Sequence, residues 1–493
     1  MPSTKITLIP GTPDDDNRDY LPEAIKGSDI VVNENGNNSH PYPEGLQEHT
    51  GEVIEGTTDT WFTYVPSSYD GSAPVPLVVS MHGGLMTGWG QAIYTSWTLL
   101  AEREGFICLF PNAHQRRFWL IEVADNELES SVRPNDSGVF LNPPPRSPED
   151  NHDLAMVRRL IGRMRETYAI DGSRIFMQGM SMGNLMTDQF TRHFGDILAG
   201  AAGSGGPTSP ALLFDENDRP VNAAGPVAIW QSRLDLDAVP PQYTSGVSEV
   251  VRRNREYWLE INGVQGRPQI AIEGESNFAF YEGDHAPVVF RDVFNRDHGQ
   301  TFDDAELVWD YLFSGTRRGD EGSIQVRDTI SPRVGDSNAV AIAENRALAW
   351  VDNEPVEIGG VCFRHDKLKY HGLDGGELVR GSYLYVPVRF LASAFGAVVD
   401  SADDGLVATL TFANGTTVEL ARGIVGAVVD GRLRSMYAEA VHRDGQLWIS
   451  LEWLCDDVLG LRTTTNGSVL YVSERHARLS KNMADLIDDL LTV

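Results

Sequence analysis

The residues of this chain best suited to nucleophilic chemistry are a serine between two glycines, in Gly179-Met-Ser-Met-Gly183. A strand is expected before this motif, over residues 174–178, and an amphipathic helix after it, over residues 184–194. In so sharp a turn, a side chain at either glycine would collide with neighbouring backbone. The helix N-terminus behind the serine would favour a developing negative charge. The pattern predicts Ser181 as the nucleophile of an acyl transfer, and a plain glycine-rich turn is the alternative.

A serine nucleophile needs a base near neutral pH, and seven histidines follow it in the chain. His298 directly follows an expected strand over residues 288–295 and precedes an expected helix over residues 303–313. It would therefore lie at the same edge of the sheet as Ser181. His285 precedes that strand and would lie at the opposite edge. We predict His298 as the base, with His285 as the alternative.

The base in turn needs a carboxylate that holds its ring. Asp235 and Asp237 both come just past the expected end of a strand over residues 226–231. We predict Asp235 as this acid, with Asp237 as the alternative. The order Ser181, Asp235, His298 along the chain is the order of the triad in an α/β-hydrolase.

The motif His82-Gly83-Gly84 ends an earlier expected strand, over residues 76–81, and can place a backbone N–H opposite the nucleophile. We predict an oxyanion hole from the N–H groups of Met182 and Gly84, with Gly83 close behind, although a tight turn would also explain the glycines. His82 and Trp119 are candidates for substrate binding. For Trp119, packing in the core is favoured over a place in the wall of the acyl or aromatic pocket.

Strands and helices that could position these residues alternate between about residue 50 and residue 316. The short apolar runs are rich in β-branched and aromatic residues, and the helical segments between them are amphipathic. This alternation predicts an α/β fold, a mostly parallel sheet with helices on both faces. The expected strands cover residues 76–81, 106–110, 174–178, 227–230 and 288–293, and the expected helices cover residues 91–104, 153–168, 184–194, 247–262 and 303–313.

The remaining chain predicts a second, smaller domain. Residues 383–396 recur in outline as residues 446–460, and each copy is a short strand that runs into a helix ending at glycine. Such a repeat favours an α+β domain. The expected organisation is an N-terminal extension (1–49), a catalytic α/β domain (50–318), a linker (319–340), an accessory domain (341–475) and a C-terminal helix (476–493).

Composition excludes several classes of function. The 493 residues carry 40 Lys and Arg against 70 Asp and Glu, a net charge of −30, which disfavours nucleic acid and anionic membranes as partners. No apolar stretch is long enough to span a membrane. Three scattered cysteines and the lack of a P-loop, a dinucleotide fingerprint or an HExxH helix predict no cofactor and no metal. Asp14-Asp-Asp16 lacks the spacing of a calcium loop.

The α/β region, over about residues 50–318, resembles the esterase family of poly(3-hydroxybutyrate) depolymerases and feruloyl esterases. The resemblance is carried by Pro76-Leu-Val-Val-Ser-Met-His-Gly-Gly84, by residues 168–183 with the serine motif, and by Ala305-Glu-Leu-Val-Trp-Asp-Tyr-Leu-Phe313. It implies an α/β-hydrolase fold, ester hydrolysis and the same triad. In that family the catalytic histidine precedes the last helix by a short loop, as His298 does.

The repeat region, over about residues 341–475, resembles the N-terminal domain of copper amine oxidases. Tyr385-Val-Pro-Val-Arg-Phe-Leu-Ala392 and Val428-Val-Asp-Gly431 carry this resemblance. The name does not imply copper, and no His-X-His spacing occurs there. The resemblance implies a structural role, or contact with a polysaccharide or an envelope.

Together these features predict a serine carboxylic-ester hydrolase that acts through an acyl-enzyme. Its expected substrates are feruloyl or acetyl esters of plant polysaccharide, or short hydroxyalkanoate polyesters. The alternatives are a non-catalytic envelope or polymer-binding protein on a hydrolase scaffold, and a serine peptidase. The first residues lack a signal-peptide pattern, which is expected both of a cytoplasmic protein and of an exported one whose signal has been removed. Between the two, we expect a secreted or envelope-associated protein in preference to a cytoplasmic one.

Overall fold

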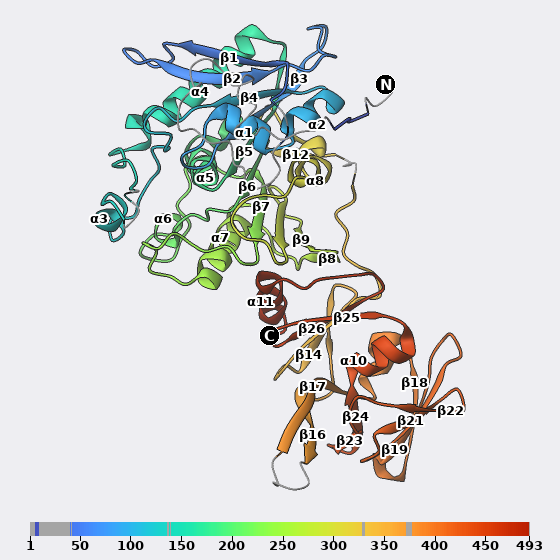
Figure 1. Cartoon of the computed structure of the whole chain (residues 1–493). Helices are drawn as coiled ribbons and strands as arrows, with labels where there is room; N and C mark the ends of the chain where they lie inside the picture. The colour runs from blue at the N-terminus through green and yellow to red at the C-terminus, as the bar shows by residue number, and fades with distance from the viewer. Residues whose placement is uncertain are drawn as a thin grey trace, which may run out of the picture. The chain divides into compact units, whose positions relative to one another are not determined.

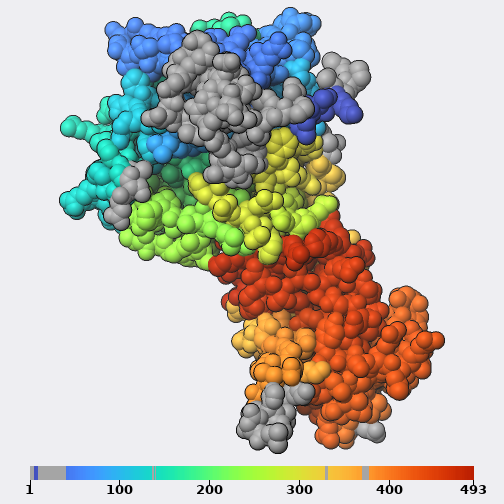
Figure 2. Space-filling view, viewed as in Figure 1, coloured from blue at the N-terminus to red at the C-terminus, as the bar shows by residue number. Residues whose placement is uncertain are grey.

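The computed structural model describes residues 5–8, 40, 42–135, 138, 140–327, 331–370 and 377–492. These residues are drawn as a cartoon in Figure 1 and as atoms in Figure 2. They form two compact units, each described by itself: unit 1 holds residues up to 266 and residues 280–333, and unit 2 holds residues 267–279 and 334–493. Asp14-Asp-Asp16 and most of the predicted N-terminal extension lie outside the described residues.

Unit 1 is built on a mostly parallel sheet, as the sequence predicts. Its described strands pair in the order β1-β2-β4-β3-β5-β6-β7-β10. Pairing is antiparallel from β1 to β4 and parallel from β4 to β10. The strands are β1 (Leu46–Gly51), β2 (Asp59–Tyr64), β3 (Val75–Met81), β4 (Ile107–Pro111), β5 (Ile170–Met180), β6 (Gly200–Ser204), β7 (Ala228–Leu234) and β10 (Val288–Val293).

Helices cover both faces of this sheet, and the alternation of side chains along β5 shows how. Phe176 stacks on Phe313 just after α8, with ring centroids 4.4 Å apart, whereas Gly179 faces α5 on the other side. On the first face, α2 packs against α8. The helices of unit 1 are α1 (Gly88–Tyr94), α2 (Trp97–Glu104), α3 (Leu128–Ser131), α4 (His152–Thr167), α5 (Met182–Phe194), α6 (Pro210–Leu213), α7 (Val247–Ile261) and α8 (Asp304–Tyr311).

Unit 2 is rich in strands, and its described residues form three antiparallel sheets around a shared apolar core. Their orders are β15-β14-β13-β26-β25, β16-β17-β24-β23 and β18-β19-β20-β21-β22. The first sheet holds β13 (Val340–Ala343), β14 (Leu348–Val351), β15 (Glu354–Glu357), β25 (Arg462–Asn466) and β26 (Val469–Ser473). The others hold β16 (Phe363–Tyr370), β17 (Glu377–Pro387), β18 (Val398–Ala402), β19 (Val407–Thr411), β20 (Thr417–Ala421), β21 (Gly426–Val429), β22 (Arg432–Ser435), β23 (Val441–Arg443) and β24 (Gln446–Ser450).

The repeat predicted in unit 2 is visible as two strand–helix units. β17 leads into α9 (Phe390–Phe395), which ends at Gly396 with φ 64°. β24 leads into α10 (Leu451–Trp453), which continues as a π-helix and ends at Gly460 with φ 69°. The two strands pair antiparallel, with Val386 opposite Ile449, so the copies bury each other.

Further short elements lie near the division between the units. A hairpin crosses the expected start of the linker: β11 (Thr316–Arg318) ends the expected catalytic domain, and β12 (Ile324–Val326) lies in the expected linker. β8 (Gln269–Glu273) and most of β9 (Ser276–Tyr281) are assigned to unit 2, and α11 (Lys481–Leu490) is its last helix. Among the described helices, none combines the length and the apolar character that a membrane crossing requires.

Candidate active site

Ser181 occupies a strained turn between β5 and α5. Its backbone has φ 56° and ψ −121°, a conformation that side-chain-bearing residues rarely adopt. Cβ atoms at the two motif glycines would be impossible: one at Gly179 would lie 2.1 Å from the Gly183 carbonyl oxygen, and one at Gly183 would lie 2.1 Å from the Met81 carbonyl oxygen. The glycines therefore allow the close packing of strand and helix that presents the serine at the end of β5.

His298 lies against Ser181, on the loop between β10 and α8. Its Nε2 is 2.7 Å from Ser181 Oγ, and its Nδ1 is 2.9 Å from Asp237 Oδ1. Because a carboxylate only accepts, Nδ1 carries the proton and Nε2 accepts the serine hydroxyl. The His298 side chain is 51% exposed, so this base is open to substrate and water. His285, the alternative from sequence, is exposed beside the loop after α7 and takes no part in this chain of hydrogen bonds.

The carboxylate on His298 is that of Asp237, which corrects the preference for Asp235. β7 continues to Leu234, three residues beyond the expected end, and a turn then follows in which Asp237 N–H donates to Leu234 O at 2.8 Å. This turn brings Asp237 under His298. Asp235, two residues earlier, points elsewhere and its Oδ2 accepts the N–H of Asn295 at 3.2 Å.

The environment of His298 favours its protonated form. The hydrogen bond with Asp237 raises the pKa of His298 above its ordinary value, burial opposes this, and the negative charges of Asp237 and Asp297 add to the rise. An imidazole in this setting is a stronger base toward the serine hydroxyl. The arrangement can take a proton from Ser181 and stabilise the resulting imidazolium.

A cavity of about 460 Å³ opens beside Ser181 and His298. Its walls are mainly apolar, with Phe118, Ile121 and Leu212 among them, and Gly84 and Met182 also line it. Glu127 and Ser209 are buried polar residues in its wall: burial raises the pKa of the Glu127 carboxyl, against the hydrogen bond that it accepts from Ser209 Oγ at 2.8 Å. The cavity therefore suits an apolar or aromatic acyl group.

His82 and Trp119 lie behind this cavity and do not line it, which corrects their expected role in substrate binding. Both are fully buried. Trp119 Nε1 donates to His82 O at 2.7 Å, and the two rings are 4.6 Å apart. His82 is held between Gly83 O at 2.7 Å and the N–H of Ala113 at 2.9 Å. Burial lowers the pKa of His82 to about 4, against the hydrogen bond to Gly83, so the ring is neutral. Its hydrogen bonds hold the loop after β3 against the loop after β4.

Phe118 is one of several cavity residues that the sequence did not indicate. It precedes Trp119, and a Cβ at Gly84 would lie 3.1 Å from its ring. In an irregular segment neighbouring side chains face different ways, and no periodicity indicates which of two adjacent aromatic residues faces the cavity.

Unit 1 also holds three side chains that could serve as metal ligands outside the triad. They are Asp59, His114 and His152, whose donor atoms all lie within 4.8 Å of one another.

Comparison with known proteins supports the two resemblances predicted from the sequence. The family model of the copper amine oxidase N-terminal domain matches residues 373–469. A feruloyl esterase B from Piromyces equi is 24% identical over 259 residues, which cover 50% of this chain and 43% of that protein. A poly(3-hydroxyalkanoate) depolymerase C from Paucimonas lemoignei is 27% identical over 147 residues, which cover 30% of this chain and 31% of that protein.

Among solved structures, an acetyl xylan esterase from Aspergillus awamori is similar, with a TM-score of 0.37 and 15% identity, over 54% of this chain and 98% of that one. The chain spans less than half the length of the curated relatives described above. The chain thus combines an α/β unit similar to feruloyl esterases and polyhydroxyalkanoate depolymerases with a region similar to the copper amine oxidase N-terminal domain.

Proposed function

We propose that unit 1 is a serine carboxylic-ester hydrolase that works through an acyl-enzyme. The observation that carries this proposal is the pair of hydrogen bonds that joins Ser181 to His298 at 2.7 Å and His298 to Asp237 at 2.9 Å. The strained backbone at Ser181 supports it, because such strain is kept where it positions a reactive group. The esterase names of the relatives agree with it.

In the first half of the reaction, Ser181 Oγ attacks the ester carbonyl carbon while His298 Nε2 takes the hydroxyl proton. Asp237 keeps the imidazole in the tautomer with the proton on Nδ1 and stabilises the imidazolium that forms. The bond from carbon to the alcohol oxygen then breaks, and His298 returns its proton to the leaving alcohol. In the second half, water replaces the serine hydroxyl as the nucleophile and releases the acid.

The negative charge on the carbonyl oxygen is stabilised by the N–H groups of Met182 and Gly84. Met182 is the first residue of α5, where backbone N–H groups point out of the helix and the dipole is positive. Around Gly84, the neighbouring N–H of Leu85 donates to Arg117 O at 2.9 Å and that of Met86 donates to Gly83 O at 3.2 Å. Both residues line the cavity with Ser181, which supports this assignment.

The substrates that fit this proposal have an apolar or aromatic acyl group of modest size. Feruloyl and acetyl esters of plant polysaccharide, and short hydroxyalkanoate polyesters, meet that description, and the mainly apolar walls of the cavity would receive the acyl part. For unit 2 we propose a structural role or attachment of the enzyme to such a polymer or to an envelope.

A fluorophosphonate probe tests the nucleophile directly, because it reacts with an activated serine. We expect labelling of the wild type and of Ser72→Ala, which removes an exposed serine elsewhere in unit 1, and no labelling of Ser181→Ala. An unlabelled wild type would favour the alternative of a hydrolase scaffold without catalysis.

A pull-down with cellulose, xylan, peptidoglycan and polyester tests the role proposed for unit 2. The full chain carrying Ser181→Ala is suited to it, because the polymer is then not consumed. Retention on one polymer would support attachment, and failure on all four would leave the structural role.

A further inference from the structure

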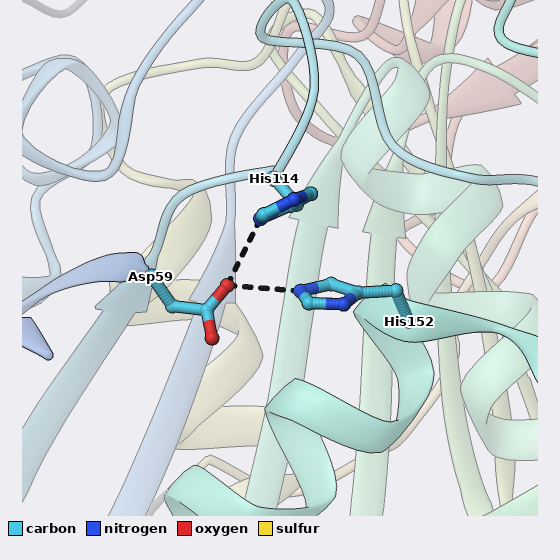
Figure 3. Close-up of side chains that lie close together, drawn as sticks. All are labelled: Asp59, His114 and His152. Carbon is cyan, nitrogen blue, oxygen red and sulfur yellow. Dashed lines mark hydrogen bonds and ion pairs between the residues drawn. The ribbon is translucent and has the colours of Figure 1, made fainter. Parts of the chain in front are cut away.

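Two imidazoles converge on one carboxylate oxygen in unit 1, outside the triad (Figure 3). Asp59 Oδ1 lies 3.1 Å from His114 Nδ1 and 2.9 Å from His152 Nε2. The ring centroids of the two histidines are 4.0 Å apart. The residues come from three elements: the first residue of β2, the loop after β4 and the first residue of α4.

These separations are those of ligand atoms around a small metal ion. Nitrogen and oxygen ligands at about 2.0–2.1 Å from a tetrahedral zinc ion are about 3.3 Å from each other. The oxygen–nitrogen separations of 3.1 and 2.9 Å are within a few tenths of an ångström of that value. Small side-chain rotations would therefore admit an ion between the three atoms. Each neutral imidazole needs only to carry its proton on the other ring nitrogen.

The donor groups are oriented by a surrounding set of hydrogen bonds. Asp59 Oδ2 accepts the N–H of Ile54 and the hydroxyl of Thr57, both at 3.3 Å, which turns Oδ1 toward the histidines. Asp153 Oδ1 accepts the main-chain N–H of His114 at 3.3 Å, which fixes the loop that carries this histidine. Such outer contacts are typical of metal sites, where they hold the ligands in place.

The charge of the cluster also favours a cation. Asp59 and Asp153 are both buried, at 2% and 0% exposure. The described side chains that pair with Asp59 are the two histidines and Thr57, and Asp153 accepts only backbone N–H groups in the described contacts. The proposed ion would therefore lie among two buried carboxyl groups, an environment that suits a cation better than an anion or an apolar group.

We propose that Asp59 Oδ1, His114 Nδ1 and His152 Nε2 bind a divalent transition-metal ion, with zinc as the ion that best suits two imidazoles and one carboxylate. The His114 and His152 side chains are 23% and 15% exposed, so a water molecule can complete the coordination. The ion would join the start of β2, the loop after β4 and the start of α4. This proposal does not depend on the esterase activity.

Metal content tests the site on the intact protein. The protein is stripped with EDTA, given zinc chloride, freed of excess zinc by desalting and analysed by mass spectrometry. We expect about one zinc per chain in the wild type and in His285→Gln, which removes an exposed histidine elsewhere in unit 1. Asp59→Asn and His152→Gln should retain little zinc. The asparagine still offers one oxygen to the histidine N–H groups, so this variant keeps the hydrogen bonds of the cluster while it loses the negative charge.

Two further measurements on the wild type avoid any loss of fold by a variant. Zinc at a hundred times its Kd should raise the Tm by about 5 °C over the EDTA-treated protein. Cobalt(II) should give the strong visible absorption of a four-coordinate ion with nitrogen and oxygen ligands. A wild type that retains no zinc and gives no cobalt spectrum would overturn the proposal, as would equal retention by Asp59→Asn, His152→Gln and the wild type.

Discussion

Two of the histidine–carboxylate clusters in unit 1, the one at His298 and the one at Asp59, differ in which group is shared. In the first, one imidazole, that of His298, lies between a carboxylate and a hydroxyl. In the second, one carboxylate, that of Asp59, lies between two imidazoles. A shared imidazole can take a proton on one side while it is held on the other, which suits general base catalysis. A shared carboxylate gathers donors around one point, which suits a cation.

Both clusters lie at the same edge of the sheet, but different strand directions bring them there. Ser181, Asp237 and His298 follow the ends of the parallel strands β5, β7 and β10. Asp59 instead is the first residue of β2, which runs antiparallel to β4. Trp61 of β2 lies opposite Pro111 of β4, so the start of β2 meets the end of β4. An antiparallel strand, paired with β1 on one side and β4 on the other, thus brings a carboxylate to the same end of the sheet from its own N-terminus.

The largest expected effect is a loss of activity that leaves the proposed metal site unchanged. Ser181→Ala should lower kcat on p-nitrophenyl acetate by about 10⁴–10⁶-fold, because the nucleophile is lost. Zinc retention should stay at the wild-type level, since the serine contacts none of the three proposed ligands. Initial rates and metal content, measured on the same preparations, check both statements. Equal rates for the two proteins would contradict the catalytic role of Ser181.

The second prediction distinguishes the two aspartates after β7. Asp237→Asn should lower kcat by about 10⁴-fold, because an amide does not hold the imidazole in the productive tautomer and does not stabilise its cation. Asp235→Asn is the matched control, as its carboxylate meets the backbone of Asn295 and not His298, and it should change kcat little. A larger loss in Asp235→Asn than in Asp237→Asn would reverse the assignment.

The third prediction concerns pH. The hydrogen bond with Asp237 raises the pKa of His298 above the ordinary histidine pKa of about 6.5. The neutral imidazole, which is the form that acts as the base, therefore becomes the main form only at a higher pH than for an ordinary histidine. On the acidic side kcat/KM should rise about tenfold per pH unit and then level off. The midpoint should move to lower pH in Asp237→Asn, assayed at an enzyme concentration raised to offset its lower kcat. A flat profile between about pH 5 and 8 would contradict a histidine base.

The sequence predicted much of the catalytic edge because its residues follow strands with strong apolar patterns. Ser181 and His298 were placed from the ends of two such strands, and the structure brings them within 2.7 Å. The choice between Asp235 and Asp237 depended on where β7 ends and on the turn that follows, and neither leaves a periodic signal. For the same reason, the sequence did not indicate whether Phe118 or Trp119 faces the cavity.

The elements that the sequence did not indicate are those whose residues lack this pattern. β6 consists of Gly200-Ala-Ala-Gly-Ser204, small residues that let α5 approach the sheet, and a Cβ at Gly203 would overlap the Asn184 side chain. β1 and β2 form the polar edge of the sheet, with few buried residues in β1. Because β2 was not expected, the sequence offered no reason to bring Asp59 near His114, and a metal was not predicted.

The smallest expected effect links the two clusters. The loop that carries His114 continues to Phe118 in the cavity wall, and Arg117 O from the same loop accepts the N–H of Leu85 beside Gly84. Removal of the metal by EDTA should therefore loosen the wall and raise KM for p-nitrophenyl butyrate about two- to fivefold while kcat changes little.

Asp59→Asn should show the raised KM without EDTA and no further rise with it. A fall in kcat with unchanged KM would contradict this account, because it would place the ion at the chemical step. The comparison of KM with kcat is the informative one here. An ion that only orders the cavity wall should change how well the acyl group is held, and so KM, whereas an ion at the chemical step should change kcat.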